Sequence, residues 1–133
     1  MAYKKRGYGQ SSLLPWTTAK PPGEQEKRFI QLGNSLVLDE RFSALSVGAK
    51  SLYVCMLLES GGKNEFPFSK GVARRKYKIA PSTYDRYRRE LIEAGYIELM
   101  NNLANPEYMG QFSANRFRFS WEKWRSGTNR RPP

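Results

Sequence analysis

The chain has 133 residues, and its 23 lysines and arginines outnumber its 12 aspartates and glutamates, giving a net charge of +11. It has no histidine and one cysteine, which excludes an internal disulfide and a thiolate zinc site and removes the commonest general base. The length suits one domain with tails, no apolar run is long enough to predict a membrane span, and the basic excess is typical of a nucleic-acid partner. No acidic pair or phosphate-binding loop has catalytic spacing, so we expect no enzyme, cofactor, metal or small-molecule substrate.

The two ends of the chain have the composition of disordered basic tails, over residues 1–27 and 126–133. The first tail contains Lys4-Lys5-Arg6, which suits either a minor-groove arm or a solubilising segment. Residues 28–125 are expected to form the folded domain. Within it, Phe29–Leu32 and Leu36–Leu38 are short apolar runs that suggest extended segments or a small hairpin.

A turn of helix is expected over residues 39–42, followed by a clear helix that begins after Ser46 as its N-cap. Gly61-Gly62 ends this helix. Its apolar residues recur on one face, at Ala49, Leu52, Tyr53, Met56 and Leu57.

Phe66-Pro67-Phe68 suits a short edge strand, because proline cannot donate to a ladder. Ser69 is the N-cap of a helix over 70–77 that buries Val72, Ala73 and Tyr77. After a turn over 78–80, a third helix runs from Pro81 to Ala94 with Tyr84, Tyr87 and Leu91 on its inner face. Gly95 is placed to end it with a left-handed residue, and Tyr96 to fold back onto Leu91.

Two alternating segments close the domain. Residues 97–100 and 116–121 are predicted strands, joined by a loop over 101–111, and Trp121 and Trp124 are expected to close the core. The predicted fold class is therefore α+β, mainly helical, with a helix, strand, helix, turn, helix, strand and strand in order.

These residues resemble a known family. The pattern that carries the resemblance is Ile79, Ser82-Thr83-Tyr84, Arg86, Glu90-Leu91 and Gly95-Tyr96-Ile97, which is similar to the recognition helix and first wing strand of winged helix-turn-helix proteins. Residues 45–53 resemble the first helix of winged-helix domains in plasmid and mobile-element replication initiators, and 115–119 their closing wing strand. The resemblance covers residues 29–124 and implies one three-helix core with a two- or three-stranded wing.

The sequence departs from the family pattern at two positions in the turn. Lys78 stands where glycine is usual, because that position often needs a positive φ. Ala80 stands where a serine or threonine usually caps the helix, which forgoes about 1 kcal/mol. The initiators themselves are longer, so the resemblance implies a transcription regulator or replication accessory protein of a bacterial plasmid, phage or conjugative element. The single cysteine, Cys55, cannot form an internal disulfide, which fits the reducing cytoplasm.

The outward face of the 81–94 helix is the predicted contact with double-stranded DNA. Arg86 and Arg89 are expected to read bases, because arginine pairs bidentately with guanine in the major groove. Ser82 and Thr83 lie at the helix N-terminus, which favours a phosphate. Asp85 is expected either to accept from a cytosine amino group or to hold an arginine in place.

Cations outside this face are expected to contact the DNA backbone. From Ser69 to Glu90 eight cations stand against two anions, an imbalance that a phosphate-binding surface tolerates. The predicted backbone contacts are Lys70, Arg74, Arg75, Lys76 and Lys78, with Arg116 and Arg118 beside the wing.

Three alternatives stay open. The charged helix could be a solvated face with ion pairs Arg86–Glu90 and Arg89–Glu93. Tyr77, Tyr84 and Tyr87 could stack on RNA or single-stranded nucleic acid, although tyrosines at helical spacing are more often core. The domain could also serve only protein interaction. A homodimer is a further possibility, because many helix-turn-helix proteins read two half-sites, yet no dimer helix is evident.

Overall fold

The computed structural model describes residues 13–100 and 115–121. The chain divides into two compact units, residues 1–31 and 32–133, whereas the predicted tail ends at residue 27. In the described part of the first unit the regular structure is one 3-10 turn, η1 (Pro15–Thr17), which Thr17 closes by donating its backbone N–H to the Leu14 carbonyl at 2.9 Å.

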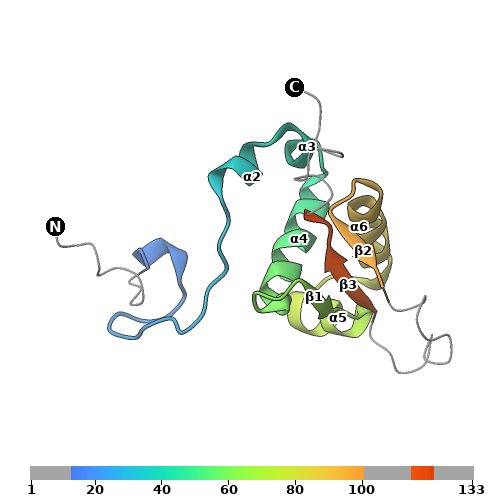
Figure 1. Cartoon of the computed structure of the whole chain (residues 1–133). Helices are drawn as coiled ribbons and strands as arrows, with labels where there is room; N and C mark the ends of the chain where they lie inside the picture. Colours follow the sequence, from blue (N-terminus) through green and yellow to red (C-terminus); the bar gives the residue numbers. More distant parts are fainter. Residues whose placement is uncertain (1–12, 101–114, 122–133) are drawn as a thin grey trace. The chain divides into compact units, whose positions relative to one another are not determined.

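The second unit is α+β, as predicted, with five helices and one three-stranded antiparallel sheet in its described residues (Figure 1). The helices and strands follow one another as α2 (Asn34–Leu38), α3 (Glu40–Ser43), α4 (Val47–Ser60), β1 (Glu65–Pro67), α5 (Lys70–Tyr77), α6 (Pro81–Glu93), β2 (Ile97–Leu99) and β3 (Arg116–Phe119).

The start of this unit differs from the sequence prediction. Residues 29–32 have no regular secondary structure, and 36–38 belong to helix α2 instead of an extended segment. The Gly33 carbonyl accepts from the backbone N–H of Leu36 at 3.1 Å and closes the first turn. Asp39 then caps α3 by accepting from the Arg41 N–H at 2.9 Å, which confirms the helical turn expected there.

Helix α4 is the central helix and begins and ends as predicted. The Ser46 hydroxyl accepts from the Ala49 N–H at 3.1 Å, and Gly61 adopts the left-handed conformation at φ 60. The predicted inner face is buried except for Leu57, which is half-buried. Its fully covered members are Ala49, Leu52, Tyr53 and Met56.

The sheet has the strand order β1-β3-β2, so β1 with its Pro67 is an edge strand as expected. In the central strand β3, Phe117 and Phe119 face the core while Arg116 and Arg118 alternate with them. The predicted loop over 101–111 and Trp124 lie outside the described residues. The expectation that Trp121 closes the core is wrong, because its side chain is 41% exposed just after β3.

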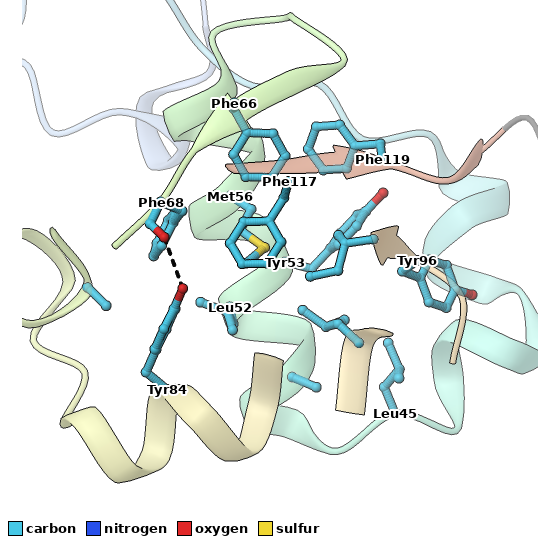
Figure 2. Packing of buried hydrophobic residues seen from close by; sticks show 14 of the residues in the cluster. Leu45, Leu52, Tyr53, Met56, Phe66, Phe68, Tyr84, Tyr96, Phe117 and Phe119 are labelled. Atoms are coloured by element: carbon cyan, nitrogen blue, oxygen red, sulfur yellow. Dashed lines mark hydrogen bonds between the residues drawn. The ribbon is translucent and has the colours of Figure 1, made fainter. Parts of the chain in front are cut away.

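An aromatic core joins the sheet to α4 and α6 (Figure 2). The ring of Tyr53 on α4 meets Tyr96 and Phe119 edge-on, with centroids 5.7 and 5.6 Å apart. Phe68, which follows β1, stacks on Tyr84 of α6 at 5.8 Å. Because edge-on and offset aromatic pairs add to the free energy of burial, this core fixes α6 against the sheet as well as against α4.

Candidate nucleic-acid interface

The turn between α5 and α6 has the backbone conformation that the family pattern implies, without the usual glycine. Ser69 caps α5 by accepting from the Val72 N–H at 3.0 Å. Lys78 ends α5 in the left-handed region at φ 61, the one non-glycine residue with a positive φ in the described part of the chain. A side chain in this conformation costs about 1 kcal/mol, so the lysine occupies the position at a small cost in stability.

The N-terminus of α6 has no side-chain cap. Ala80 stands at the cap position with extended backbone, and Pro81 occupies the first helical position, as predicted. Neither Ser82 nor Thr83 replaces the missing cap. Within the described ranges, the first-turn amides of α6 therefore have no side-chain oxygen as a partner.

Two side chains fasten the middle of α6 to the rest of the unit. The buried Tyr84 donates its hydroxyl to the Phe68 carbonyl at 3.0 Å, and burial raises the pKa of this tyrosine to about 12 (Figure 2). The Glu90 carboxylate accepts from both the backbone N–H and the hydroxyl of Ser46, at 2.8 and 2.7 Å. Glu90 thus binds the N-terminus of α4, where a negative charge is favoured, instead of pairing with Arg86.

The C-terminus of α6 is closed as the sequence predicts. Gly95, at φ 86, donates its N–H to the Ile92 carbonyl, and Tyr96 donates to the Leu91 carbonyl, both at 3.0 Å. These are the two bonds of a Schellman cap. Arg41 from α3 adds a bond to the Ala94 carbonyl at 2.9 Å, where a cation is favoured, so α6 is held in its middle and at its C-terminal end.

Helices α4 and α6 meet closely at Tyr87. A β-carbon added to Gly48 of α4 would lie 1.9 Å from the Tyr87 Cζ, so only glycine fits below this ring. The guanidinium of Arg86 lies 4.9 Å from the centroid of the same ring and donates to the tyrosine hydroxyl at 3.2 Å. The half-buried tyrosine therefore links the α4 contact to an exposed arginine.

The outward face of α6 carries the predicted base-reading residues. Ser82, Arg86 and Arg89 are exposed, and Thr83 is half-buried at the edge. In the described part of the chain neither arginine has an ion-pair partner, so the alternative pairs Arg86–Glu90 and Arg89–Glu93 are not formed there.

Asp85 has a different environment from these neighbours. Its carboxylate lies 3.2 Å from the Lys70 ammonium of α5 and 3.4 Å from the Arg88 guanidinium. One carboxylate oxygen is buried. Asp85 therefore holds an arginine, which is one of its two predicted roles. That arginine is Arg88, which was not among the predicted site residues. The i, i+3 spacing of Asp85 and Arg88 is the sequence signal that could have indicated the pair.

The cations of α5 divide into paired and unpaired ones. Arg74, Arg75 and Lys78 are exposed, and none forms an ion pair within the described ranges. Lys76 instead binds Glu59 of α4 at 2.5 Å.

The Tyr77 hydroxyl also donates to Glu59, at 2.8 Å. Burial alone would raise the pKa of Glu59, but the bonds from Lys76 and Tyr77 outweigh it and lower the pKa. Lys76 consequently joins α5 to α4, and its charge is largely offset.

The two arginines of β3 lie on the sheet rather than on the helices. Arg118 pairs with Glu98 of the neighbouring strand at 2.7 Å, which offsets its charge, and Arg116 is exposed. The structure thus brings together, on α5, the turn and α6, a set of exposed cations without acidic partners among the described residues: Arg74, Arg75, Lys78, Arg86 and Arg89.

The fold and this surface define a small α+β domain that presents a cationic pair of helices. No protein-family model, curated protein or solved structure matches the chain. Within residues 13–100 and 115–121, no cluster of histidine, cysteine, aspartate and glutamate is suited to a metal ion, and none of the helices has the length and apolar character needed to cross a membrane.

Proposed function

We propose that this chain binds double-stranded DNA sequence-specifically through a winged helix-turn-helix in which α6 is the recognition helix. The order of elements from α4 to β3 supports the arrangement, because helix, strand, helix, turn, helix and two strands follow one another as in that family. The strand order β1-β3-β2 supports it too, since the strand before α5 pairs with the last strand.

The observation that carries the proposal is a set of exposed arginines on α5 and α6 that have no acidic partner among the described residues. An α-helix fits the major groove of B-DNA, and arginine pairs bidentately with guanine there. Arg86 and Arg89 on α6 are the proposed base-reading residues. Arg74 and Arg75 on α5 are the proposed phosphate contacts, which set the register of the recognition helix on the duplex without reading sequence.

The single-strand alternative is less favoured because its stacking platform is not accessible. Tyr84 is completely buried and hydrogen-bonded to Phe68, and Tyr77 is half-buried with its hydroxyl on Glu59. Base stacking requires an exposed ring face. The alternative of a pure protein-interaction domain predicts that the chain does not bind nucleic acid.

The biological role follows from the family resemblance alone. We propose a regulator or replication accessory protein of a bacterial plasmid, phage or conjugative element, acting in the cytoplasm. The exposed serine and threonine of the first α6 turn, Ser82 and Thr83, are the proposed additional phosphate contacts at a helix N-terminus without a side-chain cap.

The test is selection of bound fragments from a random duplex library, followed by fluorescence anisotropy on the selected site. Arg86→Ala and Arg89→Ala should reduce the preference for the selected site by about 1–3 kcal/mol. Arg75→Ala should weaken all duplexes alike and lower the salt slope by about 1. Lys63→Ala is the charge-matched control, because Lys63 is exposed in the segment between α4 and β1 and outside both helices.

Each alternative has its own outcome. Better competition by single strands than by duplex would favour the stacking function. Absence of retention by any nucleic acid at about 0.15 M salt, where exposed charges act only over about 8 Å, would favour protein interaction. Equal losses from Lys63→Ala and Arg75→Ala would show that binding follows net charge and not this surface.

A further inference from the structure

Three arginines lie close together in the sequence of α6, and each has a different environment. Arg88 is half-buried, and its guanidinium lies 3.4 Å from the Asp85 carboxylate, which offsets its charge. Arg89 is exposed, and its side chain forms no ion pair, hydrogen bond or ring contact with the described residues. Arg86 is exposed too, but its Nη2 donates to the Tyr87 hydroxyl at 3.2 Å, and its guanidinium lies 4.9 Å from the ring centroid.

Tyr87 holds Arg86 without neutralising it. A tyrosine side chain carries no charge at neutral pH, so the guanidinium keeps its positive charge beside the ring, in the range of a cation–π contact. An acidic partner, such as the one that Arg88 has, would also hold an arginine, but it would offset the charge and occupy donors that a DNA contact needs. Among the arginines of α6, Arg86 therefore combines exposure and a defined position with a charge that no acid in the described residues offsets.

The position of the Tyr87 ring is set by helix α4. The ring lies so close to Gly48 that a β-carbon there would overlap its Cζ, its Cε2 and its hydroxyl oxygen. The end of the side chain that accepts from Arg86 thus lies directly against the α4 backbone. Because α4 carries much of the buried core, the packing of α6 on α4 fixes the place of this hydroxyl.

The contact with Tyr87 leaves the arginine able to pair with a base. A guanidinium has several N–H donors in one rigid plane, and the bond to the tyrosine uses one of them. A bidentate pair with N7 and O6 of guanine can therefore still form. An unheld arginine loses side-chain entropy when it is ordered on a base, whereas an arginine that is already held loses less and adapts less readily to a wrong base.

We infer that Tyr87 positions Arg86 for a guanine in one base pair of the DNA site, and so sets the preference at that base pair without touching the DNA itself. The inference rests on the proposed function and adds to it a residue that the sequence placed on the inner face of α6. A tyrosine that mattered only for folding would affect every base pair alike.

The first measurement is made on the full chain without DNA, so it does not depend on binding. Nitrogen–proton NMR correlations of the arginine Nε–Hε groups are assigned with Arg86→Lys and Arg89→Lys variants. The Arg86 signal should carry a ring-current shift and a higher side-chain order parameter than the Arg89 signal. Tyr87→Leu should remove both differences, whereas Tyr87→Phe should keep the ring-current shift.

The second measurement is fluorescence anisotropy with the selected duplex and with duplexes that differ from it at one base pair. Arg86→Ala and Arg89→Ala identify the base pair that each arginine reads. At the Arg86 base pair, Tyr87→Phe and Tyr87→Leu should reduce the discrimination by about two- to tenfold, with leucine at the upper end. At the Arg89 base pair the discrimination should stay unchanged, and in an Arg86→Ala background the tyrosine variants should have no effect on it.

A variant on the other helix tests the same contact from below. Gly48→Ala displaces the Tyr87 ring without altering the sequence of α6, so it should reduce the discrimination at the Arg86 base pair as well. The matched control is Val47→Ala, because the neighbouring Val47 side chain is 81% exposed and its truncation should leave the discrimination unchanged.

Two results would overturn this inference and leave the proposed function intact. One is an Arg86 signal that Tyr87→Leu leaves unchanged in the free chain. The other is a loss of affinity in the Tyr87 variants that is equal at every base pair and persists in the Arg86→Ala background. A wild-type chain with no preference among duplexes would overturn both the inference and the proposed function.

Discussion

Replacing Gly48 by alanine tests how α6 is fitted to α4. Gly48 is the second residue of α4, and where space is free alanine is favoured over glycine in a helix by up to about 1 kcal/mol. Here the new methyl would lie 1.9 Å from the Tyr87 Cζ and 2.1 Å from its Cε2, well inside van der Waals contact. The ring must therefore move, and its contact with Arg86 at 4.9 Å must move with it.

The magnitude follows from two opposing terms. Overpacking at a well-filled contact costs about 1–3 kcal/mol, toward the low end here because the atoms concerned are at the far end of a side chain. Subtracting the propensity gain, Gly48→Ala should lower the free energy of unfolding by up to about 2 kcal/mol. In a Tyr87→Ala background the clash is absent, and Gly48→Ala should raise the free energy of unfolding by up to about 1 kcal/mol.

The assay is urea unfolding of the wild type, both single variants and the double variant, followed by circular dichroism. The resulting double-mutant cycle should give a coupling free energy of about 1–3 kcal/mol between positions 48 and 87. If Gly48→Ala changes the free energy of unfolding by the same amount with and without Tyr87, then α4 and α6 do not approach closely at these two residues, and α6 packs on α4 in another way.

Three further predictions concern single residues and pH. Ala80→Ser should supply the missing cap of α6 and raise the free energy of unfolding by about 1 kcal/mol, measured as a higher melting temperature. Ser69→Ala, which removes the cap of α5, is the control and should lower the melting temperature. No gain from Ala80→Ser would mean that the first-turn amides of α6 already have partners. Asp85→Asn removes two part-exposed ion pairs, so the free energy of unfolding should fall by less than about 1 kcal/mol. The substitution also releases Lys70 from its ion pair, so the salt slope of duplex DNA binding should steepen by about 1. An unchanged slope would show that Lys70 does not contact the DNA. Burial raises the pKa of Tyr53 and Tyr84 to about 12, whereas an unfolded tyrosine loses its proton near pH 10. The contribution of these two groups to the free energy of unfolding should therefore be complete below pH 10 and be lost from there to pH 12. Urea titrations across this range check the loss, and Tyr84→Phe should make it smaller.

The parts of the fold that follow local rules could be predicted from the sequence. Ser46 and Ser69 cap helices because a hydroxyl reaches amides three residues ahead, and Gly95 ends α6 because glycine tolerates a positive φ. The alternation of arginine and phenylalanine identified β3, because successive side chains of a strand point to opposite faces of the sheet. The run Leu36–Leu38 misled because three apolar residues have no measurable period, so helix and strand are equally compatible with them.

The pairing of charges could not be predicted, because the partners are far apart in the sequence. Glu90 meets Ser46 across 44 residues, and Lys76 meets Glu59 across 17. Sequence spacing offered Arg86 as the partner of Glu90, since i, i+4 neighbours share a face. Only the packing of α6 on α4 decides that the carboxylate turns inward, and that decision is what leaves Arg86 without an acidic neighbour among the described residues.

The anchoring of α6 distinguishes the positions that hold the helix in place from those that do not. The hydrogen bonds that hold the helix, among the described residues, involve Tyr84, Glu90 and the carbonyls of its last turn, while Ser82 and Arg89 contribute to none of them. Residues with no share in the anchoring are open to replacement without unfolding the domain. A library randomised at Ser82 and Arg89 would therefore vary the proposed DNA-contacting face alone, with melting temperature as the measure of whether the anchoring of α6 is kept.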